Sequence, residues 1–114
     1  MITDDDVRRL ALALPATTEK PSYGTPGFRV NDKLFARIRD EGDLLVVWVA
    51  DLGEKEALLA ADPAKFTTTP HYDGHPTVLV RMGAVDVDEL GELLADAWRA
   101  RAPRRLRDSL DAGD

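Results

Sequence analysis

The chain has 114 residues, of which 44% are hydrophobic and 32% charged, and its formal net charge is −6. This length suits one domain with one core, and the composition is typical of a globular protein rather than a disordered, fibrous or membrane protein. The absence of cysteine excludes disulfides, zinc–thiolate sites, iron–sulfur clusters and thiol catalysis.

The sequence also carries no pattern of export or of membrane insertion. No apolar run approaches the roughly 20 residues that span a bilayer, and the acidic start lacks the basic and then apolar pattern of a secretion signal. We therefore expect a cytoplasmic protein that does not contact a membrane, folded as a single domain over residues 1–114.

The first predicted element is a helix capped by Thr3, with acidic residues 4–6 at the positive end of the helix dipole. The spacing of Val7, Leu10, Ala11 and Leu14 predicts its buried stripe. Pro15 ends the helix. Residues 16–27 contain two prolines and two glycines, so we expect an ordered loop there.

A β-hairpin is predicted next, with strands at residues 28–30 and 34–39 joined by a turn at residues 31–32. Because strand side chains alternate, two faces are expected. One face carries Leu34, Ala36 and Ile38, and the other carries Phe35, Arg37 and Arg39. The apolar residues 44–49 then predict a central strand that is covered on both sides.

The second half of the chain alternates helices with a strand. We expect a helix between a cap at Asp51 and the Asp62-Pro63 pair, a core position for Phe66, and a strand at residues 77–82. A longer helix begins after Asp86, and Pro103 separates it from a short final helix. The buried stripe of the longer helix is predicted to be Val87, Leu90, Leu93, Leu94, Ala97 and Trp98.

Several segments resemble the landmarks of MmcQ/YjbR family domains. They are residues 18–30 (TEKPSYGTPGFRV) with 33–36 (KLFA), the pairs at 62–63 (DP) and 102–103 (AP), and residues 69–72 (TPHY) and 96–99 (DAWR). The resemblance implies an α+β fold, an antiparallel sheet with helices packed on it, often described as frataxin-like or secretion-chaperone-like. It further implies DNA binding by sheet hairpins that approach the duplex, and it brings no catalytic residues.

The hairpin supplies the first candidate binding residues, which are Arg29, Lys33, Arg37 and Arg39. Side chains on alternate strand positions lie about 6.5 to 7 Å apart, close to the phosphate repeat of a nucleic-acid strand. Neighbouring acids such as Asp40 and Glu41 also allow a solely structural interpretation. Because the net charge is negative, any DNA binding is expected to be weak and sensitive to salt.

A second basic group lies near the C-terminus, at Arg99, Arg101, Arg104, Arg105 and Arg107. Cations at the end of a helix also stabilise its dipole, and Asp108 and Asp111 can neutralise them locally. We therefore expect the hairpin cations to dominate any DNA contact.

A possible ligand pocket is the third candidate, formed by Glu19, Lys20, Tyr23, His71 and Tyr72. These residue types can move protons or bind a small molecule or protein partner, but Glu19 and Lys20 can equally hold a polar loop. No nucleophile motif, phosphate-binding glycine loop or dinucleotide fingerprint accompanies them. The sequence predicts neither an enzyme nor a cofactor.

The two histidines raise the question of a metal. His71 and His75 flank Asp73, but Pro70 and Pro76 bracket the segment as a turn, and no further ligand is identified. We predict no metal site.

Overall fold

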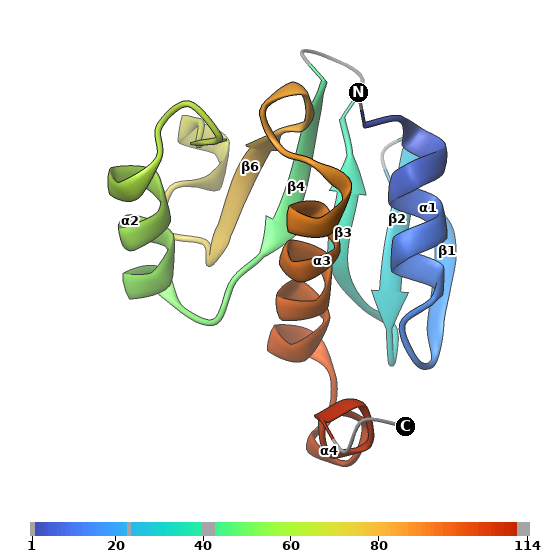
Figure 1. Cartoon of the computed structure of the whole chain (residues 1–114). Coiled ribbons are helices and arrows are strands. Elements are labelled where there is room, and N and C mark those ends of the chain that lie inside the picture. Colours follow the sequence, from blue (N-terminus) through green and yellow to red (C-terminus); the bar gives the residue numbers. More distant parts are fainter. Residues whose placement is uncertain (1, 23, 40–42, 112–114) are drawn as a thin grey trace.

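The computed structural model describes residues 2–22, 24–39 and 43–111, and these form an α+β structure with one antiparallel sheet (Figure 1). The described strands are β1 (Thr17–Ser22), β2 (Thr25–Val30), β3 (Lys33–Ile38), β4 (Leu44–Trp48), β5 (Phe66–Thr67) and β6 (Thr77–Arg81). Their order across the sheet is β1-β2-β3-β4-β6-β5. The predicted fold class is confirmed.

The helices are distributed unevenly over the two faces of this sheet. Helices α1 (Asp4–Leu12) and α3 (Val87–Arg101) pack on one face, α2 (Leu52–Ala61) lies beside β5 and β6, and α4 (Arg104–Asp111) crosses below α3 (Figure 1). Two short 3₁₀ helices, η1 (Pro70–Tyr72) and η2 (Met82–Ala84), flank β6. We call the side of α1 and α3 the inner face and the opposite side the outer face.

The core lies between the inner face and the helices. Leu94 and Trp98 of α3 are completely buried there, as the helical spacing predicts. The Trp98 indole donates a hydrogen bond from Nε1 to the carbonyl oxygen of Pro15, at 2.9 Å. A buried tryptophan usually pairs its N–H in this way. Trp98 therefore joins α3 to the segment after α1 by apolar packing and by this hydrogen bond.

Helix α1 begins as expected, at a capping box formed by Thr3 and Asp6. The backbone N–H of Thr3 donates to the Asp6 carboxylate at 3.0 Å, and this bond holds the pKa of Asp6 below its usual value. Val7 and Ala11 are buried against the core, and Leu10 and Leu14 pack beside them. The predicted stripe is confirmed.

The expectation of a loop over residues 16–27 is wrong, because β1 and the start of β2 occupy this segment as a hairpin. The prolines that indicate a loop stand at positions where the sheet does not need a backbone N–H donor. Pro21 lies on the edge strand, and Pro26 precedes the β2–β3 ladder, which begins at the pair Gly27–Arg37. Gly24, with φ +82°, supplies the left-handed turn residue between the strands.

The hairpin of β2 and β3 forms around Asn31 and Asp32, which both have positive φ, as two-residue hairpin turns require. The predicted alternation of its second strand is wrong at Leu34 and Phe35. Arg29 pairs with Leu34 and Phe28 with Ala36, so Phe35 is the extra residue of a β-bulge. The bulge places Phe35 in the core with Ala36 and Ile38 and moves Leu34 to the outer face with Arg37.

The remaining elements follow the sequence closely. The Asp51 carboxylate accepts the N–H of Glu54 at 2.8 Å and caps α2, and Phe66 is buried within the short strand β5. No helix in the described part of the chain is long and apolar enough to cross a bilayer.

Candidate functional site

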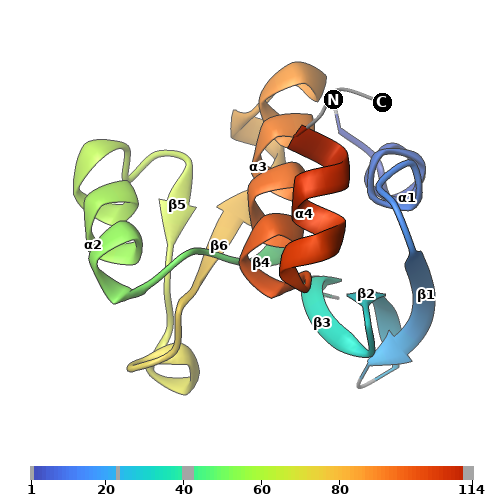
Figure 2. The same cartoon turned by 90° about the horizontal axis from the view of Figure 1, so that it is seen from below.

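A hollow of about 550 Å³ opens on the outer face, and we call it the outer pocket. Strands β3, β4 and β6 and the turn around η1 contribute its walls. Seen from below, that turn, coloured yellow, lies on the opposite side of the sheet from α3 and α4 (Figure 2). The described residues that line the outer pocket are Leu34, Arg37, Val46, Trp48, His71, Tyr72, His75 and Thr77.

The turn is held in place by Lys55 of α2, whose side chain is buried. Its ammonium donates hydrogen bonds to the carbonyl oxygens of Tyr72, at 2.6 Å, and His75, at 3.0 Å. Carbonyl oxygens of a turn need such donors when they are withdrawn from water. Lys55 therefore fixes the backbone that carries the histidines and the tyrosine of the pocket.

Arg37 links the sheet to the same turn. Its guanidinium donates from Nη2 to the Tyr72 hydroxyl oxygen at 2.9 Å and from Nη1 to the Thr25 hydroxyl oxygen at 3.2 Å. These two hydroxyls fix the orientation of the guanidinium. The planar fork of an oriented arginine matches a carboxylate or a phosphate.

The apolar part of the outer pocket comes from Leu34, Val46 and Trp48. Arg101, at the end of α3, stabilises this part from outside the pocket. Its guanidinium carbon lies 4.8 Å from the centre of the Trp48 ring, and its Nε donates to the Leu34 carbonyl oxygen at 3.0 Å. Partial burial lowers the pKa of Arg101. These contacts support the position of the Trp48 indole.

Thr77 contributes a hydroxyl that has no hydrogen-bond partner among the described residues, although the residue is only 1% exposed. Such an unsatisfied buried group is uncommon in proteins. The two imidazoles of the pocket, His71 and His75, lie in exposed positions at its rim, and the His71 ring meets the Tyr72 ring edge-on at 4.9 Å.

The structure divides the predicted ligand residues between different places. His71 and Tyr72 line the outer pocket, whereas the Glu19 carboxylate accepts a hydrogen bond from Arg8 of α1 at 2.7 Å. Lys20 forms an exposed ion pair with Asp32, at 3.8 Å. Glu19 and Lys20 therefore hold the β1–β2 region to its neighbours, and Tyr23 lies outside the described residues.

The four hairpin cations are spread along β2 and β3 rather than gathered into one cluster. Arg29 and Lys33 lie close to the β2–β3 turn, and Arg37 lines the outer pocket. Arg39 follows the end of β3, so about 20 Å of strand separates it from Lys33.

The β2–β3 turn also approaches the C-terminal arginines. Asn31 and Asp32 line a hollow of about 320 Å³ together with Arg105 of α4, which crosses beneath the sheet in Figure 1. This region brings Arg105 close to the turn that Arg29 and Lys33 flank, and it also contains Asp32. We call it the basic end and define it by Arg29, Lys33, Arg104 and Arg105.

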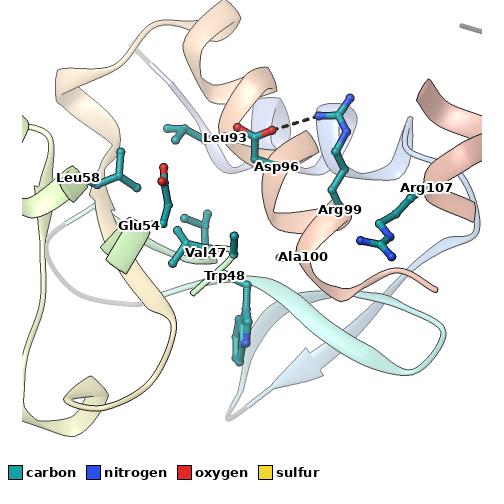
Figure 3. A pocket seen from close by; sticks show the side chains of 11 residues that line it. Val47, Trp48, Glu54, Leu58, Leu93, Asp96, Arg99, Ala100 and Arg107 are labelled. Carbon is teal, nitrogen blue, oxygen red and sulfur yellow. Dashed lines mark hydrogen bonds and ion pairs between the residues drawn. The ribbon is translucent and has the colours of Figure 1, made fainter. Parts of the chain in front are cut away.

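A third hollow, of about 410 Å³, lies between α2 and α3 on the inner side of β4 (Figure 3). Glu54 and Leu58 face Leu93 and Asp96 across it, while the Trp48 ring points away. Asp96 forms an ion pair with Arg99 at 3.1 Å. Charges of both signs line this hollow, so it has no clear electrostatic preference.

Of the described lining residues, the sequence predicts only His71 and Tyr72 as ligand residues. It misses Trp48 and Thr77 among others, and it also misses Lys55, which holds the turn from outside the pocket. Strict alternation of side chains along β4 would have placed Trp48 on the face of the sheet that faces away from the core, because residues 45 and 47 point into the core. Lys55 precedes Leu58 and Leu59 at helical spacing, so it lies on the packed side of α2. Nothing in the sequence indicates that the Thr77 hydroxyl is left without a partner.

Within the described ranges, no three histidine, aspartate or glutamate side chains are grouped closely enough to hold a metal ion. His71 and His75 both belong to the outer pocket, whose described lining contains no carboxylate to join them.

Comparisons with known proteins give a family and a fold. The family model described as YjbR matches residues 12–100. Uncharacterized proteins of Mycobacterium bovis (Mb2600) and Mycobacterium tuberculosis (Rv2570) are each 38% identical to this chain over 123 aligned positions, covering 93% of both partners. The crystal structure of Deinococcus radiodurans protein DR2400, with family-model domain DUF419, superposes with a TM-score of 0.75 at 25% identity, covering 97% of this chain and 89% of that one.

Proposed function

The chain belongs to the YjbR family, and we propose that it is a non-enzymatic binding module that holds a small molecule in the outer pocket. One observation carries this proposal: an oriented guanidinium, that of Arg37, forms part of the wall of an otherwise mostly apolar hollow of about 550 Å³. Small-molecule sites are typically concave, mostly apolar and equipped with a few fixed polar groups.

The two tryptophans of the chain allow a direct test. Trp48 lines the outer pocket, whereas Trp98 is buried in the core on the inner face. In an NMR spectrum of the indole N–H groups, a compound bound in the outer pocket should move the Trp48 signal and leave the Trp98 signal in place. A Trp48→Phe variant assigns the two signals.

The screen uses a fragment set of ring-containing acids, amines and neutral compounds. We expect at least one of these classes to move the Trp48 signal saturably. If no class moves it at millimolar concentration, the pocket does not bind small molecules and the proposal fails.

DNA binding is the second candidate function, favoured by the meeting of the β2–β3 turn with α4 at the basic end. The proposed contacts are those of Arg29, Lys33, Arg37 and Arg39, extended by Arg104 and Arg105. The hairpin is expected to contribute more than α4, since Arg104 has Asp108 as an ion-pair partner at 4.0 Å. Arg37 is expected to contribute least of the four hairpin cations because its guanidinium already serves the outer pocket.

A fluorescence titration with duplex and single-stranded DNA at low and moderate salt tests this candidate. The double variant Arg29→Gln/Lys33→Gln should weaken binding equally for unrelated sequences and reduce the salt slope by about 2, roughly one per lost phosphate contact. Arg81→Gln, at an exposed position on β6, controls for the loss of a single positive charge elsewhere on the surface. Absence of binding at low salt would eliminate the DNA function and leave the outer pocket untouched.

A further inference from the structure

We propose that the ligand of the outer pocket carries an aromatic ring without a positive charge, and that this ring stacks on the indole of Trp48. The inference rests on the proposed function and specifies the ligand class of the same site. It also gives a role to Arg101, which lies outside the described lining of the pocket and positions the indole.

The indole of Trp48 has neighbours on one side and the pocket on another. The residue is half-buried, and the guanidinium carbon of Arg101 lies over its ring, 4.8 Å from the ring centre. Trp48 lines the outer pocket whereas Arg101 does not, so the pocket meets the indole on a side that the guanidinium leaves open. An aromatic ring that enters the pocket can therefore stack on the indole without displacing Arg101.

The indole is held in position before any ligand enters. Arg101 donates from Nε to the Leu34 carbonyl oxygen at 3.0 Å, so its side chain connects the backbone of β3 with the ring of a residue on β4. Leu34 and Val46 line the same pocket from these two neighbouring strands. Binding to a surface that is ordered in advance costs less conformational entropy. The sheet therefore offers a flat ligand a fixed ring beside apolar side chains.

The contact between Arg101 and Trp48 also disfavours a cationic ligand. A tryptophan in a pocket can bind a cation, because the face of the indole attracts positive charge. Here a guanidinium already takes that position, and no carboxylate of the described residues forms an ion pair with it. Burial lowers the pKa of Arg101, whereas a neighbouring carboxylate would raise it. A second cation on the indole would therefore be repelled by the first.

Three probes of similar size test this ligand class. They are 2-naphthamide, its fully saturated analogue decahydro-2-naphthamide, and 2-naphthylmethylamine, which is a cation at neutral pH. Binding is followed from the NMR signals of the Trp48 indole, with the Trp98 signal as the reference for an intact core. Protons that lie above the face of an aromatic ring shift upfield. We therefore expect 2-naphthamide to move the ring protons of Trp48 upfield and the saturated analogue not to do so.

The affinities should follow the same order. We expect 2-naphthamide to bind at least about threefold more tightly than the saturated analogue, because ring stacking contributes beyond the buried area. It should also bind at least about threefold more tightly than the amine, whose charge would lie roughly 10 Å from the guanidinium of Arg101.

Two matched substitutions isolate the contribution of Arg101. Arg101→Met keeps a long side chain beside the indole and removes the charge, so the affinity ratio of 2-naphthamide to the amine should fall at least about twofold. Arg81→Met, at an exposed position outside the described lining, removes a charge elsewhere and should leave this ratio unchanged. A solely structural role of Arg101 would change both affinities by the same factor, so the ratio distinguishes the two roles.

An unmoved Trp98 signal shows that Arg101→Met is folded. If this variant is unstable, Trp48→Leu supplies a second measure, read from the signals of the ligands. Leucine keeps an apolar side chain and removes the ring, so the preference for 2-naphthamide over its saturated analogue should disappear.

The outcomes separate this inference from the proposed function. Binding of 2-naphthamide without an upfield shift of the Trp48 ring protons, or equal or tighter binding of either other probe, would overturn the ligand class but keep a small-molecule pocket. An unchanged affinity ratio in folded Arg101→Met would overturn the role of Arg101. If none of the three probes binds, the inference also fails, and the fragment screen then decides separately whether the pocket binds any small molecule.

Discussion

The two faces of the sheet are covered by different means. On the inner face, Leu94 and Trp98 of α3 are completely buried among apolar neighbours. On the outer face, a short turn is fastened by hydrogen bonds from Lys55 and Arg37. Buried area stabilises the first arrangement, and a few directional contacts position the second. The inner face therefore maintains the fold, and the outer face carries the site that we propose for a ligand.

The largest expected effect is that of Trp98→Ala on the inner face. Loss of a completely buried tryptophan and of its bond to Pro15 should lower the free energy of unfolding by about 3 to 5 kcal/mol. Urea denaturation followed by circular dichroism measures the change. Leu52→Ala, at a position that is 47% exposed, should stay within about 0.5 kcal/mol of the wild type. Equal stability of the two variants would remove Trp98 as the core anchor.

An intermediate effect is expected from Lys55→Met, which keeps the length of the side chain and removes its donors. The carbonyl oxygens of Tyr72 and His75 would lose their partner, so stability should fall by about 1 to 3 kcal/mol. The Trp48 indole signal should shift even without ligand, because the turn moves. Glu56→Gln, at an exposed position on the same helix, is the control. A Lys55→Met protein with an unchanged Trp48 signal would show that the turn does not depend on Lys55.

Tyr72→Phe should have a smaller effect, about 0.5 to 1.5 kcal/mol, because it removes one acceptor of Arg37 and leaves the ring in place. A double-mutant cycle with Arg37→Gln isolates this contact from other consequences of either change. We expect a coupling energy close to the effect of Tyr72→Phe alone. Simple additivity of the two substitutions would mean that the hydroxyl does not orient the guanidinium.

The same difference between faces explains which parts of the fold the sequence predicts. The stripe of α3 repeats at helical spacing over about three turns, so most of its buried residues are evident without a structure. Val87 is the exception: the spacing predicts it in the stripe, but it lies at the first turn and is 41% exposed. The sequence does not reveal the β1–β2 hairpin, because Pro21 and Pro26 normally indicate a loop. Only the pairing of the strands shows that the sheet needs no backbone donor at these two positions. The bulge at Phe35 likewise depends on register, which one strand alone does not reveal.

The outer pocket was predicted only in part, for a related reason. The sequence indicates His71 and Tyr72 as ligand candidates and Arg37 as a DNA contact, because residue type shows what a side chain can do but not what lies beside it. Lys55 reaches the turn from another helix, across 17 and 20 residues of sequence to its two carbonyl partners. Such contacts arise from tertiary packing, so the local pattern of the sequence does not predict them.

The smallest expected effect lies at the start of α1, far from the outer pocket. The pKa of Asp6 is lowered chiefly by the bond from the Thr3 backbone, from an ordinary value of 3.8. A depressed carboxyl pKa contributes stability above the unfolded-state value, and that contribution is lost as pH falls through the folded-state value. The stability gap between the wild type and Asp6→Asn should therefore be present at pH 7 and narrow in urea denaturation as the pH falls below the ordinary value of 3.8. Thr3→Ala removes the hydroxyl that accepts the Asp6 backbone N–H, and this contact does not depend on ionisation, so part of its gap should persist in acid. If the Asp6→Asn gap were the same at both pH values, the carboxylate would not be the stabilising half of the capping box.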